Sequence, residues 1–372
     1  MSAHVHTMVA VITKATDSAA GMIHPPRQIS YIGRQIDPVF DRTIEARPEL
    51  SLHRIDRSRS VADLRDQLAA SHAIQIDSAR SDVPDHLRAA PALLSECPNL
   101  LVVSASGAGF DTVDVAACTK AGVIVVNQAG GNRESVAEHT LGLMLSLAKR
   151  ITETDRAMRG QGIEDRAVYM GREIHGRTLG IVGIGRCGSR VAELCRTLFS
   201  MNVLAFDPYV SAETIAAHGA RKVDLAELLD ASDFVSLHCP LDAETTGLIG
   251  AAEFSRMRKG AWFISTARGG IHDEQALHAA LSSGHLAGAG LDVWAEEPPS
   301  TDHPLLSLPN VIASPHTAGV TFEARHRVAQ MAAKQLIAIF EGGRPERLVN
   351  PEAWPGFLER FGAASTRAAR RA

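Results

Sequence analysis

The stretch that decides the fold is Leu179-Gly180-Ile181-Val182-Gly183-Ile184-Gly185-Arg186-Cys187-Gly188. It begins as a short apolar strand and leads into a helix predicted over residues 189–200. Gly183 allows the tight turn, Gly185 lets the backbone approach a pyrophosphate, and Gly188 lets the helix pack on the strand. The anion would lie on N–H groups at the start of the helix, where the helix dipole favours negative charge. By itself, the pattern fits a purely structural glycine turn equally well.

Asp207 strengthens the interpretation of this turn. It ends the next predicted strand, 19 residues after Gly188, and an acid about 20 residues beyond such a turn typically binds ribose hydroxyls. Its charge would repel a 2′-phosphate, and no Lys or Arg lies between it and Arg221. The two features together predict a dinucleotide site that takes NAD, with NADP disfavoured.

Short apolar segments alternate with helical stretches on both sides of the turn. Before it, strands are predicted at 28–33, 73–76, 100–103 and 123–126, and helical stretches at 61–70 and 84–97. From the turn onward, strands are predicted at 179–182, 203–206, 234–237, 262–265, 288–291 and 310–313, and further helical stretches at 225–231 and 273–282. Such alternation is typical of parallel sheets covered on both faces. We therefore predict an α/β protein with two doubly wound parallel-sheet domains.

The domain boundaries follow from a long amphipathic helix predicted over residues 322–340, which leaves the second series and has to pack elsewhere. We expect the chain to cross into a second domain near residue 127 and to return near residue 316. One domain would then combine residues 1–127 and 316–372, and a dinucleotide domain would occupy residues 128–315. Residues 1–27 and the tail after about residue 362 are expected to be flexible.

A helix predicted over residues 134–150 is apolar almost all the way round. Such a helix should be buried on most sides. Burial by a second subunit and burial between the two domains would each explain the pattern.

Composition argues against several classes of protein. The chain has 372 residues, of which 45% are hydrophobic and 22% charged, as in ordinary soluble proteins. A net charge of −4 provides no broad basic field for nucleic acid, and no apolar run approaches a membrane span. Five scattered cysteines suit a reducing cytoplasm, and the N-terminus lacks the features of a signal peptide. No HExxH motif or Cys/His cluster predicts a metal site.

Three polar residues, Arg268, Glu297 and His316, follow predicted strands in the second half of the chain. Ligands of open α/β sheets bind beyond the carboxyl ends of the strands. There, Arg268 could clamp a carboxylate, and His316 could give a proton to a carbonyl oxygen or take it back. Glu297, bonded to the other ring nitrogen, would fix the tautomer and stabilise the imidazolium. Each residue alone is more often structural, but in this order behind a dinucleotide turn they predict a nicotinamide-dependent oxidoreductase.

With these residues in place, the chain resembles the D-isomer-specific 2-hydroxyacid dehydrogenase family, which includes phosphoglycerate dehydrogenases and glyoxylate/hydroxypyruvate reductases. The likeness covers about residues 70–350. It rests on the glycine turn and on further motifs in the family's order: Ser106-Gly107-Ala108-Gly109-Phe110-Asp111, Ser135-Val136-Ala137-Glu138-His139, Leu237-His238-Cys239-Pro240-Leu241, Thr266-Ala267-Arg268-Gly269, Asp292-Val293-Trp294-x-x-Glu297-Pro298 and Pro315-His316.

The resemblance implies a Rossmann-type NAD domain inserted in a discontinuous, flavodoxin-like substrate domain, and a homodimer built on the helix at 134–150. It implies an enzyme that interconverts a 2-keto acid and the D-2-hydroxy acid, in which Arg268 binds the carboxylate and carbonyl and His316–Glu297 is the acid/base pair. Backbone amides of Ser106, Gly107 and Ala108 would hold the substrate carboxylate. Besides the three glycines, the positions that match cofactor contacts are Arg186, Cys187, Asp207, Pro240, Thr266, Ala267 and Asp292, the last near the nicotinamide carboxamide.

Some residues depart from the family pattern. Ser265 stands where the family commonly has Asn, and His272 stands where it has an aliphatic residue. Asp77 lies near a place where phosphoglycerate enzymes carry a basic residue, and it would repel a substrate phosphate.

Other activities share the scaffold. An NAD-sensing protein similar to the C-terminal-binding corepressors and a phosphite dehydrogenase both remain alternatives. A formate dehydrogenase is disfavoured, because members resembling it replace the glutamate found here as Glu297.

Overall fold

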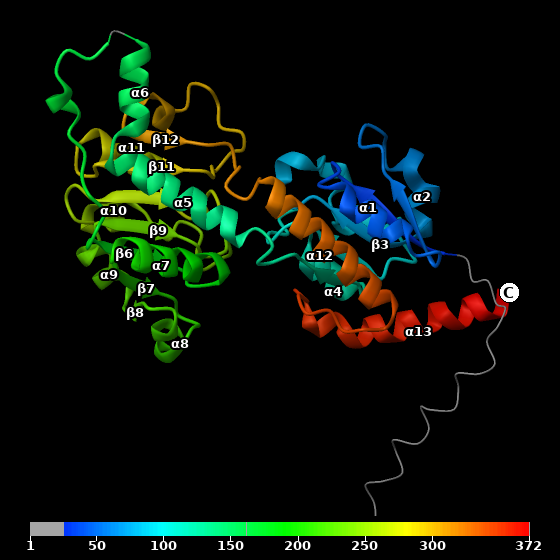
Figure 1. The fold of residues 1–372 in the computed structure, drawn as a ribbon. Coiled ribbons are helices and arrows are strands. Elements are labelled where there is room, and N and C mark those ends of the chain that lie inside the picture. Colours follow the sequence, from blue (N-terminus) through cyan, green and yellow to red (C-terminus); the bar gives the residue numbers. More distant parts are fainter. Residues whose placement is uncertain (1–25, 161, 372) are drawn as a thin grey trace, which may run out of the picture. The chain divides into compact units, whose positions relative to one another are not determined.

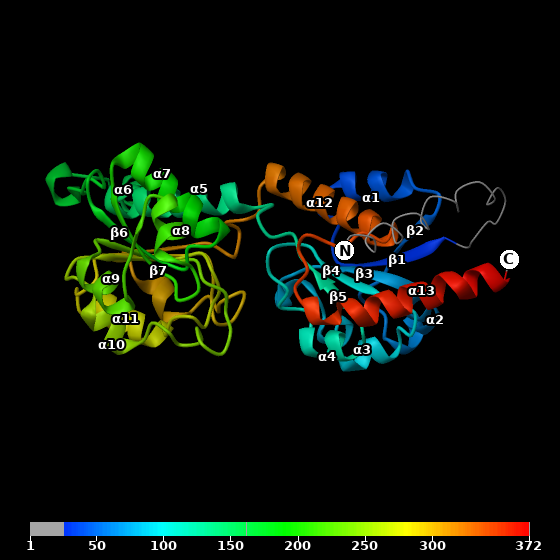
Figure 2. The same cartoon turned by 90° about the horizontal axis from the view of Figure 1, so that it is seen from below.

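The computed structural model describes residues 26–160 and 162–371. Over residues 363–371 it describes the backbone alone. The arm expected to be flexible, residues 1–27, lies almost entirely outside these described residues. The chain forms two compact units, and we describe each by itself (Figures 1 and 2). The first contains the chain up to Ser106, Phe110–Asn127 and the chain from Ala332 onward, and the second contains Gly107–Gly109 and Gln128–Met331.

The first unit is built on five strands, all paired in parallel, in the order β2-β1-β3-β4-β5. This is the flavodoxin-like order that the resemblance implied. The strands are β1 (Arg27–Ile32), β2 (Leu50–Arg54), β3 (Ser71–Ile76), β4 (Val102–Ala105) and β5 (Ile124–Val126). The helices between them are α1 (Pro38–Glu45), η1 (Ala62–Leu64), α2 (Arg65–Ala70), η2 (Arg80–Asp82), η3 (Asp85–Leu87), α3 (Pro91–Ser95) and α4 (Val115–Lys120).

The second unit is built on seven parallel strands in the order β12-β11-β10-β9-β6-β7-β8. Counted from β6, this is the Rossmann order, and its direction reverses between β6 and β9. The strands are β6 (Thr178–Val182), β7 (Asn202–Phe206), β8 (Arg221–Lys222), β9 (Phe234–Leu237), β10 (Trp262–Ser265), β11 (Gly288–Leu291) and β12 (Val311–Ala313). The helices are α5 (Arg133–Ala148), α6 (Ile151–Arg159), η4 (Arg166–Tyr169), α7 (Arg186–Phe199), α8 (Ala212–Ala217), α9 (Leu225–Ala231), α10 (Ala251–Arg256), α11 (Glu274–Ser282) and η5 (Pro304–Ser307).

The strands of the second unit direct alternate side chains into two separate cores. Phe234, Trp262 and Ile264 face the core beneath α5 and α7, whereas Val235 and Phe263 face the core beneath α9, α10 and α11. Figure 2 shows these two sets of helices on opposite sides of the sheet. A strand with a period of two residues that is apolar at every position has to be covered on both faces, so the prediction of a doubly wound sheet is confirmed.

Helix α5 is buried for a reason that we did not anticipate. Its apolar side chains pack on the sheet of its own unit, where Leu143 lies against Gly290 of β11 and Leu147 against Gly288. Packing within its own unit therefore accounts for the burial of these side chains. The exposed positions of α5 are few: Arg133, Glu138 and Gly142.

The chain ends in two long helices. Helix α12 (Phe322–Phe340) begins in the second unit and ends in the first, and α13 (Trp354–Arg371) follows the short η6 (Pro351–Ala353). The tail beyond residue 362, expected to be flexible, has a helical backbone to Arg371. No helix in the described part of the chain has both the length and the apolar character to cross a membrane.

His272 is an unusual member of the core. Its side chain is 2% exposed, its ring lies edge-on to Phe263, and among the described residues neither ring nitrogen has a hydrogen-bond partner. Burial lowers the pKa of His272 to about 4, although the charge of Asp273 opposes the shift. A buried imidazole without partners is stable only in its neutral form.

This burial predicts acid sensitivity. Because the folded-state pKa lies below the unfolded value, stability is present above about pH 6.5 and is lost as the pH falls toward 4. Between pH 7.5 and 5 the loss is about 2 kcal/mol. His272→Leu should remove this part of the pH dependence, measured as the shift of the urea unfolding midpoint by tryptophan fluorescence. If the variant lost as much stability as the wild type over this range, His272 would not be the titrating group.

Candidate functional site

The predicted site residues of the second unit share one edge of its sheet. Gly183, Asp207, Pro240, Thr266, Asp292 and His316 each lie within three residues of the end of β6, β7, β9, β10, β11 and β12, respectively. Since all seven strands run parallel, these ends lie on the same side. The topology therefore collects residues spread over more than a hundred positions at the edge where such sheets bind ligands.

The three glycines of the turn have different surroundings. Gly183 has a φ of +89°, and a Cβ there would lie 2.6 Å from the backbone nitrogen of Cys239. A Cβ at Gly188 would lie 2.2 Å from the carbonyl oxygen of Gly183, so these two glycines are needed for packing. A Cβ at Gly185, in contrast, would meet nothing within 4 Å. The middle glycine thus leaves open space at the N-terminus of α7.

That open space fits a dinucleotide. Gly185 is the N-cap of α7 and supplies no capping side chain, so a bound anion can satisfy the N–H groups of the first turn. Arg186, at the first helical position, is exposed, and Cys187 is partly buried. Burial raises the pKa of the Cys187 thiol, and the charges of Arg268 and Arg133 oppose the shift.

Asp207 is held against the glycine turn. One of its carboxylate oxygens accepts a hydrogen bond from the N–H of Ile184 at 3.1 Å, and the other accepts one from Tyr209 at 3.0 Å. The Tyr209 hydroxyl donates to Glu244. This hydrogen bond, together with the nearby charges of Asp242 and Asp207, raises the pKa of Tyr209. A group of carboxylates disfavours a 2′-phosphate, although Lys222 also reaches this loop and donates to the carbonyl of Val210.

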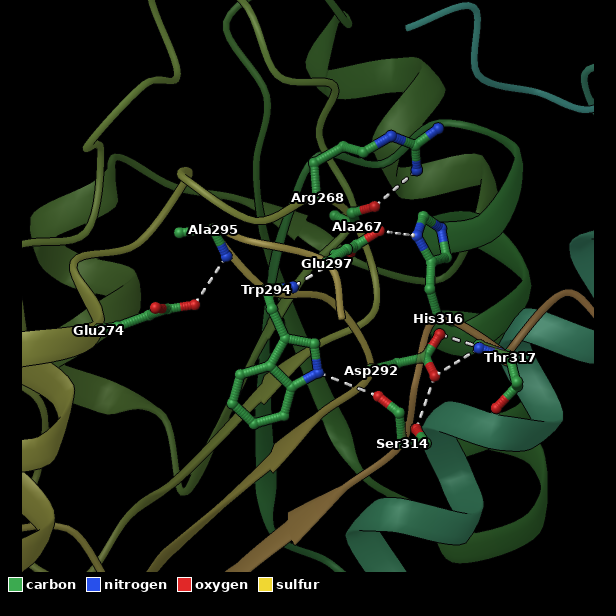
Figure 3. A network of polar contacts seen from close by, with 11 residues as sticks. Ala267, Arg268, Glu274, Asp292, Trp294, Ala295, Glu297, Ser314, His316 and Thr317 are labelled. Carbon is green, nitrogen blue, oxygen red and sulfur yellow. Dashed lines mark hydrogen bonds and ion pairs between the residues drawn. The ribbon is translucent and has the colours of Figure 1, made fainter. Parts of the chain in front are cut away.

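Arg268 follows β10 in a tightly packed loop. Its Nη1 donates to the carbonyl oxygen of Ala267 at 2.7 Å, which orients the guanidinium (Figure 3). A Cβ at the neighbouring Gly269 would lie 1.8 Å from the carbonyl oxygen of Trp294, so only glycine fits there. The hydroxyl of Thr266 is buried and donates to Thr140 of α5, which in turn donates to the carbonyl of Val136. The loop is therefore fixed on both sides.

His316 and Glu297 form a hydrogen-bonded pair. Nδ1 of His316 lies 2.8 Å from Oε2 of Glu297, and the other carboxylate oxygen accepts from the N–H of Trp294 at 3.2 Å (Figure 3). Burial opposes ionisation of Glu297. The bonds from His316 and Trp294 and the charge of Arg268 nevertheless hold its pKa below the usual value. A carboxylate on Nδ1 places a proton on that nitrogen, and Nε2 becomes the nitrogen that can exchange a proton with a ligand.

The backbone of His316 adopts a left-handed conformation, with a φ of +55°. Such a conformation is costly for a residue other than glycine and persists only where the surroundings impose it. Here the N–H of His316 donates to the carbonyl of Asp292 at 2.7 Å. The carboxylate of Asp292, which is fully buried, accepts from the N–H groups of Thr317 and Ala318 at 2.8 Å each and from the hydroxyl of Ser314 at 2.6 Å.

Asp292 therefore shapes the loop that presents His316. The Ser314 hydroxyl, because it donates to Asp292, accepts from Nε2 of His139 on α5 at 3.0 Å. The contact between Asp292 and the cofactor that the resemblance implied stays a prediction.

Ser106, Gly107 and Ala108 lie beyond β4. The N–H of Ser106 donates to Ile76, and its hydroxyl accepts from Gln75 at 2.7 Å. The carbonyl of Gly107 accepts from the N–H of Gln128 at 2.7 Å. Ser106 belongs to the first compact unit, and Gly107 and Ala108 belong to the second. Their contacts with a substrate remain a prediction.

Several residues of this site were missed, although the motifs included some of them. His139 and Trp294 lie inside the quoted motifs without an assigned role, and Glu274 was assigned only to a helix. The partners of their side chains are distant in sequence, so no local pattern indicated these residues. In the described part of the chain, no three His, Cys, Asp or Glu side chains converge as metal ligands.

The fold and this edge define a protein of the nicotinamide-dinucleotide-binding class. A family model described as "D-isomer specific 2-hydroxyacid dehydrogenase, NAD binding domain" matches residues 141–318. A glyoxylate reductase of Korarchaeum cryptofilum is 41% identical over 268 residues, which are 70% of this chain and 80% of the relative. The chain belongs to the D-isomer-specific 2-hydroxyacid dehydrogenase family.

Other relatives include longer proteins. A D-3-phosphoglycerate dehydrogenase of Archaeoglobus fulgidus is 42% identical over 72% of this chain, but only 50% of the relative is covered. The chain spans about half the length of the phosphoglycerate dehydrogenases that it matches. Among solved structures, D-lactate dehydrogenase from Aquifex aeolicus, in complex with NAD and lactic acid, is 29% identical with a TM-score of 0.73. That match covers 85% of this chain and 96% of the other.

Proposed function

We propose that this chain is an NAD-dependent oxidoreductase that interconverts a small 2-keto acid and the corresponding D-2-hydroxy acid. The observation that carries the proposal is the hydrogen bond between His316 and Glu297, at the same sheet edge as Arg268 and the glycine turn. The names of the relatives, which include glyoxylate reductases and phosphoglycerate dehydrogenases, support the same reaction class.

Each residue has a distinct part in the proposed reaction. The glycine turn and Asp207 would hold NADH, which when bound would supply the hydride. Arg268 binds the carboxylate and carbonyl of the keto acid through its planar guanidinium. Nε2 of His316 donates a proton to the carbonyl oxygen, and Glu297 stabilises the imidazolium before the transfer. In the oxidative direction, the neutral ring accepts the hydroxyl proton.

The remaining assignments are proposals of the same kind. Residues 128–315 would bind NAD, with contacts from Arg186, Cys187, Pro240, Thr266, Ala267 and Asp292. Residues 1–127 and 316–372 would bind the substrate, and the amides of Ser106, Gly107 and Ala108 would hold its carboxylate. We also place the protein in the cytoplasm, a location that the five free cysteines support.

The direct test measures NADH absorbance with purified protein and a panel of 2-keto acids: glyoxylate, hydroxypyruvate, pyruvate, phosphohydroxypyruvate and aromatic analogues. Oxidation with one or a few of them is the expected result. Demonstrated NADH binding without turnover on any keto acid would instead favour the NAD-sensing alternative. NAD reduction by phosphite would favour a phosphite dehydrogenase.

We further propose that the protein is a homodimer and that the partner covers the region next to α5. Apolar side chains gather on the segment after this helix: Ile151 is 52% exposed, Met158 66%, Val168 61% and Met170 77%. Exposed apolar side chains this close together in sequence are typical of interaction surfaces. A second copy of the chain, approaching the open position at Gly142 on α5, would cover them.

The dimer is tested by light scattering after size-exclusion chromatography. The wild type should have twice the 39.7 kDa mass of the chain. The double variant Ile151→Glu/Met170→Glu should have the mass of one chain, because charges would be buried in the interface. Leu198→Glu, at an apolar residue 59% exposed on α7, is the matched control and should remain dimeric. A monomeric wild type would refute the proposal.

A further inference from the structure

The carboxylate of Glu274 bridges two loops at the candidate active site. Glu274 is the first residue of α11, directly after the N-cap Asp273, and only 16% of its side chain is exposed. Oε1 accepts a hydrogen bond from the N–H of Ala295 at 2.8 Å (Figure 3), and Oε2 lies 3.2 Å from Nε2 of His303. Ala295 belongs to the segment that carries Glu297. Both oxygens are thus engaged away from their own helix.

His303 holds Glu274 in place from the far side. Its Nδ1 accepts a hydrogen bond from the N–H of Leu305 at 3.3 Å, so its ring proton is on Nε2 and is donated to Glu274. The ring also lies edge-on to the indole of Trp294, at 5.5 Å between centroids. Both contacts orient the imidazole of His303, which in turn orients the carboxylate of Glu274.

Trp294 connects this arrangement to the acid/base pair. Its backbone N–H donates to Oε1 of Glu297, and its indole N–H donates to the carbonyl oxygen of Ser314 at 3.0 Å. Ser314 lies two residues before His316. The segment that Glu274 holds therefore bonds to Glu297 and to the loop that carries His316 (Figure 3).

We propose that Glu274, held by His303, is a positioning residue that keeps the carboxylate of Glu297 on Nδ1 of His316. The inference rests on the proposed function and deepens it. Glu274 acts through Ala295 and Trp294. An acid in the first turn of a helix can simply stabilise the helix dipole, but such a role requires neither of the two bonds that Glu274 makes to other loops.

Glu274→Gln is the sharpest variant. Glutamine keeps the size of the side chain, but its amide offers one acceptor and one donor, whereas Ala295 and His303 both donate. One of the two bonds is therefore lost. A pair displaced by a fraction of an ångström should lower kcat about 10-fold to 100-fold. The Kd for NADH should not change, because the glycine turn and Asp207 are untouched.

A second readout does not depend on turnover. The pH midpoint at which the His316 ring titrates can be followed by NMR of histidine-labelled protein, with the signal assigned through His316→Asn. Because an adjacent carboxylate stabilises the imidazolium, loosening Glu297 should move this midpoint to lower pH. Glu297→Gln, which removes the carboxylate itself, should give the largest shift of this midpoint, and Glu274→Gln should give a smaller shift in the same direction.

Two further variants separate positioning from folding. Glu253→Gln is the matched control. The carboxylate of Glu253 also caps a helix, accepting a hydrogen bond from the N–H of Gly250 at 3.0 Å, but among the described residues it makes no bond to the 294–297 segment. His303→Phe keeps a ring against Trp294 and removes the donor to Glu274. It should give a smaller shift of the His316 midpoint in the same direction.

The proposal is supported if Glu274→Gln lowers kcat and shifts the midpoint while Glu253→Gln does neither. It is overturned if the midpoint of Glu274→Gln equals that of the wild type, whether or not kcat or melting temperature falls, because the effect would not pass through Glu297. If the wild type reduces no keto acid, the proposed function fails, but the midpoint measurement still decides the role of Glu274.

Discussion

Replacement of His316 by asparagine is expected to lower kcat about 10²–10⁴-fold, the usual contribution of a positioned acid/base group. Asparagine is the better choice because residue 316 has a φ of +55°. Asparagine tolerates this conformation more readily than alanine does, so the fold of the loop should be kept. Binding of NADH should persist, because in the described part of the chain no hydrogen bond joins the imidazole to the turn at Gly183 or to the carboxylate of Asp207.

The measurement is steady-state kinetics with the best keto acid, together with NADH binding followed by fluorescence. His218→Ala, at an exposed histidine after α8, serves as the control and should behave like the wild type. His316→Ala should show the same loss of kcat as the asparagine variant and a lower melting temperature. A His316→Asn variant with near-normal turnover would remove this residue from the mechanism.

The parts of the molecule that could be predicted from sequence are those specified locally. The glycine turn combines a strand, three glycines and a helix in ten residues, and the space around Gly183 and Gly188 shows why no other residue fits. Strands buried on both faces are continuous apolar runs, so six of the seven strands of the second sheet were placed within a residue or two. The exception, β8, has two residues and no apolar pattern.

Other features depend on contacts that sequence does not contain. The strand predicted at 100–103 occupies Val102–Ala105, because an apolar run does not mark its own ends. Glycines of β11 make room for α5 on the sheet of its own unit, a contact that the apolar pattern of the helix does not reveal. The change of compact unit at Met331 falls inside the continuous helix α12, where no turn residue marks it.

The residues of the candidate site likewise fall into those that could be predicted from the sequence and those that could not. Arg268, Glu297 and His316 follow strand ends and could be found by their types and order, and the structure brings Glu297 and His316 within hydrogen-bond distance. The residues that fix their geometry could not be found. Glu274 bonds to a residue 21 positions away, and His139 bonds to one 175 positions away. Only the parallel order of β10, β11 and β12 makes these residues neighbours.

Replacement of Arg268 by lysine is expected to lower kcat/KM for the keto acid about 10²–10³-fold, the range found when one charge-stabilising donor is removed from an active site. The positive charge is kept, but lysine lacks the planar fork that binds a carboxylate through two parallel hydrogen bonds. The bond from Nη1 to the carbonyl of Ala267, which orients the group, would also be lost. Arg258→Lys, at a surface arginine paired with Asp233, is the matched control and should retain wild-type kinetics.

A change in the substrate shows whether Arg268 acts by binding the substrate carboxylate or only through its positive charge. The wild type should strongly prefer a keto acid over the matching keto amide, because only the acid offers a carboxylate to Arg268. In Arg268→Lys this preference should shrink, since activity on the amide never depended on the fork, and the interaction is isolated as in a double-mutant cycle. If the variant loses equal activity on acid and amide, Arg268 acts on the carbonyl or on Glu297, whose pKa its charge helps to lower. Unequal loss identifies the carboxylate as its ligand.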